Sequence, residues 1–298
     1  MKNQFTLLFL LFTIFTYSQS FNTEDFSEES NPKLLGKINK DKLTTKSYSE
    51  WFVKNHEEYQ SNSETINQLK ENISDYTITL FMGTWCGDSK KEVPRFYKIL
   101  EEANFPIDQL TTVAVDRVRE NYKQSPGGEQ EGMNIHRVPT FIIYKDGKEI
   151  NRIVEHPVKS LEDDILNIIN NNYKSNYQIV EKTDSLLKEM GIEKFDKKRN
   201  KVIKKIKPLA VNFFELNTYS SVLFYSNKTK EGIAIARINI SLYPNEDRGY
   251  VNLANKLYRT GKSKEALSFY NKALVINPSN KSAKKSIQDI NSKEDLKR

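Results

Sequence analysis

The 298-residue sequence contains few of the residues that form cross-links or bind metals: one cysteine, Cys86, and three histidines. A single cysteine excludes an internal disulfide. His56, His136 and His156 lie far apart in the chain, and no cysteine and histidine pair has the spacing of a metal site. We therefore expect no metal and no other cofactor. A lone cysteine in an exported protein suggests a reactive thiol or a bond to another molecule.

Long apolar runs are also missing, with one exception near the N-terminus. The run Phe5 to Tyr17 follows Lys2, precedes Ser18, and is shorter than the roughly 20 residues of a membrane-spanning helix. A basic residue, a short apolar run and small residues after it are typical of a secretory signal peptide. We expect residues 1–18 to be a cleaved signal rather than an uncleaved anchor. The protein would then be exported to a bacterial periplasm or extracellular space, with no membrane span left.

The charge balance is moderately basic, with a formal net charge of +7 that falls to +6 when Lys2 leaves with the signal. Such a balance does not by itself indicate nucleic acid, and export argues against it. We expect no nucleic-acid partner. The excess positive charge fits a solvated surface that anionic components of an envelope would attract.

Cys86 lies in residues 83–90, between an apolar strand and an amphipathic helix. The strand is predicted at Tyr76 to Met82, because that stretch is β-branched and aromatic. Downstream, Val93, Phe96 and Leu100 recur at helical spacing. The cysteine therefore falls at a helix N-terminus, where unpaired N–H groups and the helix dipole favour a thiolate.

These residues resemble the thioredoxin superfamily, whose Trp-Cys-Gly-x-Cys motif lies in the same strand-to-helix turn. Pro94 stands where that family has a helix-kinking proline, and Val138-Pro139-Thr140 precedes a strand as its cis-proline loop does. The resemblance covers residues 47–172 and implies an α/β thioredoxin-like fold. It also implies roles for the site residues: catalysis by Cys86, substrate binding by Trp85, Val138 and Pro139, and motif positions at Gly87, Asp88, Ser89 and Lys90.

Two departures from the family pattern change the expected chemistry. Ser89 replaces the second cysteine, and Leu80 stands where many thioredoxins have a buried acid. A hydroxyl cannot resolve a mixed disulfide, so an outside thiol or a second cysteine of the substrate must release it. The Cys-Gly-Asp-Ser sequence also resembles the Cys-Gly-Phe-Ser of monothiol glutaredoxins, but the preceding tryptophan and the export signal argue against that family.

Charged neighbours of the cysteine leave its electrostatics open. Lys90 and Arg137 would add positive charge near the sulfur, whereas Asp88 would oppose the thiolate. His136 is a candidate base, but a lone loop histidine is expected to be solvated.

Further predictions concern the segments on either side of residues 47–172 and one loop within them. Residues 19–46 read as a flexible lead-in with a short extended piece at Leu34 to Ile38. Ser47 is expected to cap the first helix, and Ser160 the closing helix of the thioredoxin-like part. The long polar loop through residues 125–128 reads as a simple insertion or as a segment that shapes partner choice. Residues 173–215 form a basic helical linker, which either packs on the next domain or faces a membrane surface or an acidic partner.

The last third, residues 216–298, repeats itself at a spacing of 34, the period of tetratricopeptide repeats. The pairs are Tyr219 with Leu253, Ser220 with Ala254, Leu223 with Leu257, Gly232 with Ala266, Ile240 with Leu274, and Pro244 with Pro278. The first copy has Asn227 in place of the turn glycine. We expect an all-α region of two such repeats and a capping helix at Ser282 to Ile290, which either binds a peptide partner or only packs.

Three functions follow from these features and stay open at this point. The first is monothiol exchange through Cys86 on disulfide-bearing or thiol-bearing envelope proteins, with the repeats docking a partner. The second is a redox-inactive binding module or scaffold with a thioredoxin fold. The third is the cluster chemistry of monothiol glutaredoxins.

Overall fold

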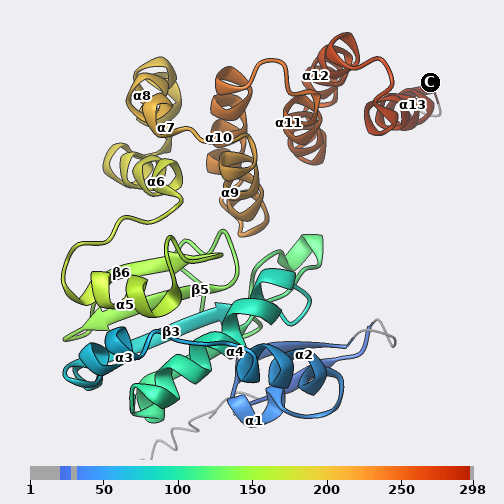
Figure 1. Ribbon diagram of the computed structural model, residues 1–298. Coiled ribbons are helices and arrows are strands. Elements are labelled where there is room, and N and C mark those ends of the chain that lie inside the picture. The colour runs from blue at the N-terminus through green and yellow to red at the C-terminus, as the bar shows by residue number, and fades with distance from the viewer. Residues whose placement is uncertain (1–20, 28–31, 296–298) are drawn as a thin grey trace, which may run out of the picture.

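The computed structural model describes residues 21–27 and 32–295, and the expected signal peptide lies outside these residues. The predicted order of an α/β fold followed by an all-helical region is confirmed (Figure 1). None of the described helices is both long and apolar enough to cross a membrane.

A six-stranded sheet with the order β1-β2-β4-β3-β5-β6 forms the α/β part. Its strands are β1 Thr23–Asp25, β2 Lys33–Ile38, β3 Tyr76–Met82, β4 Leu110–Ala114, β5 Thr140–Lys145 and β6 Lys148–Val154. The central strands β3 and β4 run parallel, and every other pair is antiparallel. The last residues of β3 therefore lead directly to Cys86, at the edge where β4 ends beside it.

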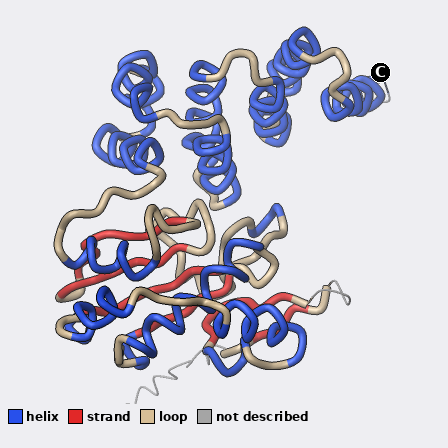
Figure 2. Tube along the Cα trace, viewed as in Figure 1, coloured by secondary structure: helices blue, strands red, loops and turns tan. Residues whose placement is uncertain are grey.

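Helices cover one face of this sheet, and a long loop covers the other. The helices are α2 Lys46–Glu57, α3 Ser63–Lys70, α4 Gly87–Glu102 and α5 Leu161–Ile169, which share one apolar core with the sheet. Figure 2 shows them in blue on the viewer's side of the red strands. On the other face, Phe81 and Ile142 pack against Ile135 and Val138 of the loop after β4. Alternate residues of β3 thus serve two separate cores.

The extended piece predicted at Leu34 to Ile38 is confirmed as part of β2, but the expectation that the rest of residues 19–46 is a flexible lead-in is wrong for the described part of that segment. Strand β1, strand β2 and the short helix α1 Lys40–Leu43 are all ordered there, and β2 pairs with β4. Lys33 explains much of this order, because its ammonium is buried and forms ion pairs with Asp116 at 2.5 Å and Asp25 at 3.2 Å. A polar composition concealed a buried charge pair.

The two predicted helix caps have different outcomes. Helix α2 begins at Lys46 after Thr45, without a side-chain cap, so the predicted cap by Ser47 is wrong. Helix α5 begins after Ser160, whose hydroxyl accepts a hydrogen bond from the Asp163 N–H at 3.2 Å, as predicted.

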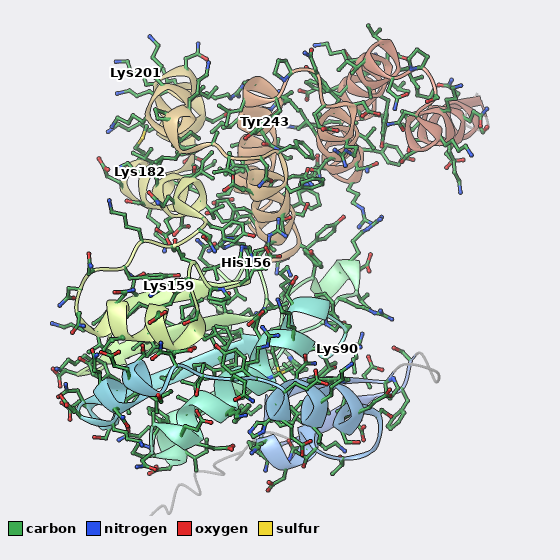
Figure 3. All side chains as sticks on the ribbon, in the orientation of Figure 1. Lys90, His156, Lys159, Lys182, Lys201 and Tyr243 are labelled. Carbon is green, nitrogen blue, oxygen red and sulfur yellow. The ribbon has the colours of Figure 1, made fainter. Side chains whose placement is uncertain are left out.

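The basic segment 173–215 is not a separate linker but part of a helical core. It contains α6 Gln178–Met190, α7 Ile192–Lys197 and α8 Arg199–Ile206. Phe195, Val202 and Ile206 are buried in one cluster with Tyr219 and Ile235 of the next helices. The lysines of α8 face outward, as Figure 3 shows for Lys201. This arrangement agrees with the expectation that the apolar side packs on the following region.

Helices α9 to α13 follow as pairs: α9 Phe214–Tyr225 with α10 Thr229–Leu242, α11 Asp247–Arg259 with α12 Ser263–Ile276, and then α13 Lys281–Asp295. Gly232 allows the first pair to approach closely, because a Cβ there would lie 2.8 Å from the Phe224 nitrogen. The turns of both pairs use a positive φ, at Asn227 (63°) and Gly261 (78°). Asparagine tolerates this conformation, which explains how it replaces the glycine.

Candidate active site

Cys86 is the residue immediately before α4, with an extended backbone at φ −90° and ψ 129°. Its N–H donates to the Gly83 carbonyl at 2.9 Å, and its own carbonyl accepts from the Lys90 N–H at 3.0 Å. The side chain is partly exposed, and its Sγ lies 3.2 Å from the Val138 carbonyl oxygen. The thiol is therefore fixed at the start of a helix, reachable from solvent, and in contact with a loop 52 residues away.

The loop that contacts the sulfur holds Val138 and Pro139, joined by a cis peptide bond. Both residues are buried at the start of β5. The Thr140 hydroxyl donates to the Arg137 carbonyl at 2.7 Å, and the Pro139 carbonyl accepts from the Glu155 N–H at 2.7 Å. These bonds hold the loop against the first turn of α4, so the structure brings together the cysteine and two of the three predicted substrate-binding residues.

Trp85, the third, lies flat beside the turn before the helix. Its indole N–H donates to the Val115 carbonyl at 2.9 Å. Its ring occupies the space where Gly83 would carry a side chain, since a Cβ there would lie 2.5 Å from the indole. Trp85 is partly buried and packs with Cys86 and Val138. The glycine and the tryptophan thus form a rigid wall next to the thiol.

Lys123 is a site residue that the sequence reasoning missed. Its side chain is 5% exposed, and its ammonium lies over the Trp85 ring, 5.2 Å from the centroid. Burial lowers the pKa of Lys123 to about 8, whereas the negative charge of a Cys86 thiolate raises it. The Lys123 ammonium and a Cys86 thiolate therefore interact electrostatically. Lys123 follows no motif in the sequence and lies in the long loop after β4.

Tyr122, next to Lys123, is the second missed residue. Burial raises the pKa of its phenol, the positive charge of Arg137 opposes this shift, and the charge of Cys86 adds to it. The long loop after β4 was predicted to be a simple insertion or a segment that shapes partner choice. It carries two side chains whose pKa values depend on the charge of Cys86. No local pattern could have identified them, because only the fold brings this loop to the cysteine.

The other predicted neighbours have less direct roles. Gly87 and Asp88 are exposed, and Lys90 is partly exposed on the first turn of α4 (Figure 3). Arg137 is paired with Glu155 at 2.9 Å and stacks on Tyr177 at 5.5 Å. Its charge is therefore largely compensated within the protein.

Ser89, which stands at the position of the second cysteine of the family motif, has a structural function. Ser89 is completely buried, and its hydroxyl accepts a hydrogen bond from the Gly83 N–H at 3.2 Å. Leu80 is also completely buried and belongs to the main apolar core. The hydroxyl secures the turn that carries Cys86, and no acid lies at position 80 to assist a second thiol.

His136 differs from its prediction as a solvated loop residue. It is 3% exposed and its ring meets the edges of Tyr177 and Tyr219, at 5.3 Å and 6.2 Å between centroids. Burial lowers the pKa of His136 to about 3, so the imidazole is neutral at ordinary pH. A base this weak and this enclosed does not serve the thiol.

The helical region contacts the loop of the cis proline, which the sequence did not predict. The Arg137 guanidinium donates to the Phe214 carbonyl at 3.2 Å, and the Gln124 amide donates to the Tyr225 carbonyl at 2.8 Å. Figure 1 shows α9 reaching down to the α/β part at this side. Among the residues with described positions, no group of three or more His, Cys, Asp or Glu side chains is placed to hold a metal ion.

Comparison with known proteins agrees with this arrangement. A family profile described as thioredoxin matches residues 39–165. A thioredoxin of Aspergillus fumigatus, Asp f 28, is 33% identical over 89 residues, which are 30% of this chain and 73% of the relative. A thioredoxin of Listeria monocytogenes is 30% identical over 98 residues, 33% of this chain and 86% of the relative. By fold, by the geometry around Cys86 and by these likenesses, the chain belongs to the thioredoxin family.

Proposed function

We propose that this protein performs monothiol exchange of disulfides through Cys86. One observation carries the proposal. Cys86 is the only cysteine in the sequence, it is partly exposed at the start of α4, and its Sγ lies 3.2 Å from the carbonyl oxygen of Val138, next to Pro139. A purely structural domain would have no need for a reactive thiol in this position. The partly exposed side chain of Trp85 beside it would form one wall of the surface for an extended substrate.

The reaction is a pair of exchanges at sulfur. The Cys86 thiolate attacks one sulfur of a substrate disulfide, so that the substrate S–S bond breaks and a mixed disulfide forms. The departing sulfur leaves as a thiolate and takes a proton from solvent. A small thiol, or a second cysteine of the substrate, then attacks the mixed disulfide and regenerates Cys86. Ser89 takes no part in this second step, because a hydroxyl cannot attack and release a mixed disulfide.

The partners that we propose are exported proteins with disulfides or thiols. The pattern of residues 1–18 supports export, since it combines Lys2, a short apolar run and small residues after it. In an oxidising compartment such a thiol meets many substrate disulfides. Fractionation of expressing cells, with mass spectrometry of the mature N-terminus, tests this part separately, and a cytosolic chain that keeps residues 1–18 would contradict it.

The helix pairs α9–α10 and α11–α12 are proposed to be two tetratricopeptide repeats that dock a partner. The 34-residue spacing supports this, because matching positions such as Tyr219 and Leu253 are both completely buried. Ser220 and Ala254 match in the same way. Helix α13 covers the end of the second pair, where Ala283 and Ile290 are buried in its core.

Trapping of mixed disulfides tests the exchange. The purified protein is incubated with an envelope extract, quenched with acid and an alkylating agent, and separated without reductant. We expect adducts that reductant removes and that Cys86→Ala lacks. The Lys264→Met variant is the control, since it changes an exposed side chain of α12 and keeps the sulfur and its turn. Adducts that persist in Cys86→Ala would contradict the proposal.

A binding module without turnover is the second candidate. The buried Ser89 hydroxyl favours it, because the second sulfur position is occupied by a group that stabilises the turn. The two candidates differ in a disulfide reduction assay with excess small thiol. Turnover that depends on Cys86 supports exchange, whereas partner capture that survives Cys86→Ala supports the binding module.

A deletion separates docking from chemistry. Removing residues 245–298 takes away α11 to α13 but keeps the cluster that joins α6 to α10. We expect the alkylation rate of Cys86 to stay the same while fewer partners are trapped. Unchanged capture would remove the docking role of the last helices.

A further inference from the structure

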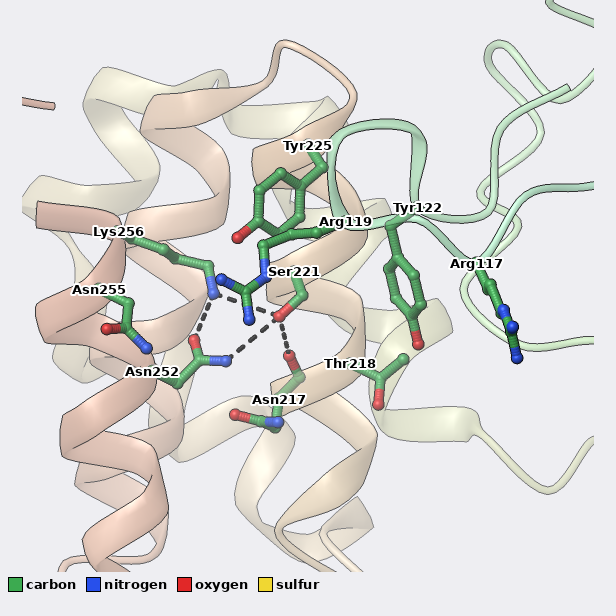
Figure 4. A pocket seen from close by; sticks show the side chains of 10 residues that line it. All are labelled: Arg117, Arg119, Tyr122, Asn217, Thr218, Ser221, Tyr225, Asn252, Asn255 and Lys256. Atoms are coloured by element: carbon green, nitrogen blue, oxygen red, sulfur yellow. Dashed lines mark hydrogen bonds between the residues drawn. The ribbon is translucent and has the colours of Figure 1, made fainter. Parts of the chain in front are cut away.

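A cavity of about 310 Å³ lies between the α/β part and the helical region, and Cys86 is not among the residues that line it. The loop after β4 supplies its floor with Arg117, Arg119 and Tyr122, and helices α9 and α11 supply the rest (Figure 4). The other lining residues are Asn217, Thr218, Ser221, Tyr225, Asn252, Asn255 and Lys256. Its volume is at the lower end of the range for small-molecule sites. The site exists only where the two regions meet.

Lys256 is the central group of this cavity. Its side chain comes from α11, is 3% exposed, and its ammonium donates to Ser221 Oγ at 3.2 Å and to Asn252 Oδ1. Both acceptors are neutral. Within the described part of the chain, no carboxylate lies in ion-pair contact with this ammonium. Its ammonium also lies over the Phe224 ring, 5.7 Å from the centroid. Buried charges in proteins are normally paired with an opposite charge, and Lys256 has only these neutral partners.

A second cation stands next to the first. Figure 4 shows the Arg119 guanidinium beside the Lys256 ammonium, and burial together with the charge of Arg119 lowers the pKa of Lys256 to about 7. Two like charges in one cavity repel each other and are stabilised together by an anion between them.

The remaining lining suits an anion attached to a polar molecule. Hydroxyl and amide groups surround the two cations, and the lining contains no aspartate or glutamate. Asn255 accepts from the Tyr270 hydroxyl at 2.6 Å with its oxygen, which leaves its amide N–H groups to donate. The site therefore offers positive charge and hydrogen-bond donors, with the rings of Tyr122 and Tyr225 as its apolar part.

We propose that this cavity binds a small organic anion whose carboxylate or phosphate group lies between Lys256 and Arg119. The anion supplies the missing counter-charge of the buried ammonium, and the hydroxyl and amide groups hold the body of the molecule. Because Tyr122 lines the cavity and precedes Lys123, a bound anion fixes the loop that reaches the cysteine site. This site is separate from the proposed exchange at Cys86 and does not depend on it.

Calorimetric titration of the full chain tests the proposal, with inorganic phosphate and succinate as probes and sodium chloride at matched ionic strength as the reference. We expect saturable binding of at least one probe, and the probe that binds distinguishes the phosphate source from the carboxylate source. Lys256→Met removes the charge, keeps an unbranched side chain one atom shorter, and is expected to weaken binding about tenfold or more. The matched control is Lys264→Met, which removes the same charge from an exposed position of α12.

Arg119→Ala is the second variant. Because Arg119 is exposed, we expect the substitution to leave the fold intact. We expect it to weaken binding as well, with circular dichroism unchanged. The absence of saturable binding for both probes would overturn the proposal. So would saturable binding that Lys256→Met and Arg119→Ala leave unchanged, since the ions would then occupy another place.

Discussion

At the scale of single residues, the surroundings of Cys86 are set by side chains distant in sequence. Lys123 reaches the sulfur site from the loop after β4 and lies over Trp85. A buried ammonium beside a thiolate attracts it more strongly than an exposed one would, because solvent screens the interaction less. We therefore expect Lys123, rather than Lys90, to be the cation with the larger effect on the reactivity of the thiol.

Lys123→Met is predicted to slow the alkylation of Cys86 at pH 7 by roughly threefold to tenfold, since the thiolate loses a nearby positive charge. Iodoacetamide labelling followed by mass spectrometry measures the rate. Lys90→Met removes the same charge from the first turn of α4 and should have a smaller effect. A larger effect of Lys90→Met would show that the wrong lysine has been assigned.

Lys256 is predicted to make the free energy of unfolding depend on pH. Burial lowers its pKa from 10.5 to about 7 in the folded protein. Between these values the unfolded chain binds the extra proton, so the stability contributed by this group rises as pH increases from about 7 to 10. Facing groups are Arg119 from the loop and Tyr122 and Tyr225 across the cavity.

Urea unfolding at several pH values, without added phosphate or carboxylate, measures this dependence. Lys256→Met should be more stable than the natural chain at pH 6 and should lose the rise above pH 7. Lys264→Met should keep it. An identical pH profile for Lys256→Met would mean that the ammonium is not held in the cavity as described.

Which residues of the site could be predicted from the sequence depends on how far along the chain their partners lie. Cys86, Trp85 and Pro139 could be predicted, because a local motif and its order carry them. Lys123 could not, since nothing in its own segment marks it. The burial of His136 could not either, because Tyr177 and Tyr219 enclose it from a different region.

At the scale of elements, the N-terminal strands show how a charge can order a segment that composition assigns to a flexible lead-in. The core strand β3 and helix α4 are visible in the sequence as apolar patterns. Strand β2 has Lys33 at a buried position, so its sequence lacks the apolar pattern that would predict a strand beginning there. Only the pairing with Asp116, 83 residues later, makes that lysine compatible with the sheet.

Lys33→Ala is predicted to lower the free energy of unfolding by ~3–5 kcal/mol, because it leaves the Asp116 carboxylate buried without its partner. The hydrogen bonds to Asp116 and Asp25 raise the pKa of Lys33 despite the opposing effect of burial, which is the larger single cause. Urea unfolding gives the value. Lys37→Ala, on the same strand, is the control and should change it by ~0.5 kcal/mol or less. Equal effects would contradict a special role of the pair.

At the scale of the whole molecule, the helical region rests on the loop that forms one side of the cysteine site. Arg137 joins the two regions, since it bonds to Glu155, stacks on Tyr177 and donates to the Phe214 carbonyl. The period of 34 residues predicts helix pairs, but a period says nothing about where the pairs dock. The contact between the regions therefore had to come from the structure.

Arg137→Ala is predicted to increase amide exchange in α9 and in the loop before Pro139, while strand β3 keeps its protection. The reason is that the substitution removes a hydrogen bond and a stacked contact between the regions. Hydrogen–deuterium exchange with mass spectrometry measures this. Arg199→Ala, which breaks a surface pair with Asp196, should leave both segments unchanged. Equal exchange in the two variants would show that Arg137 does not join the regions.

The presence of a single cysteine determines which kind of disulfide the protein could form when it is oxidised. A protein with two neighbouring thiols can close a disulfide within itself and so leave its target. This chain has no such internal ring to form. Each disulfide that it holds joins it to a second molecule, so the mass of the protein reports its redox state directly. An intact-mass spectrum taken without reductant would read out both the oxidised fraction and the identity of whatever is attached.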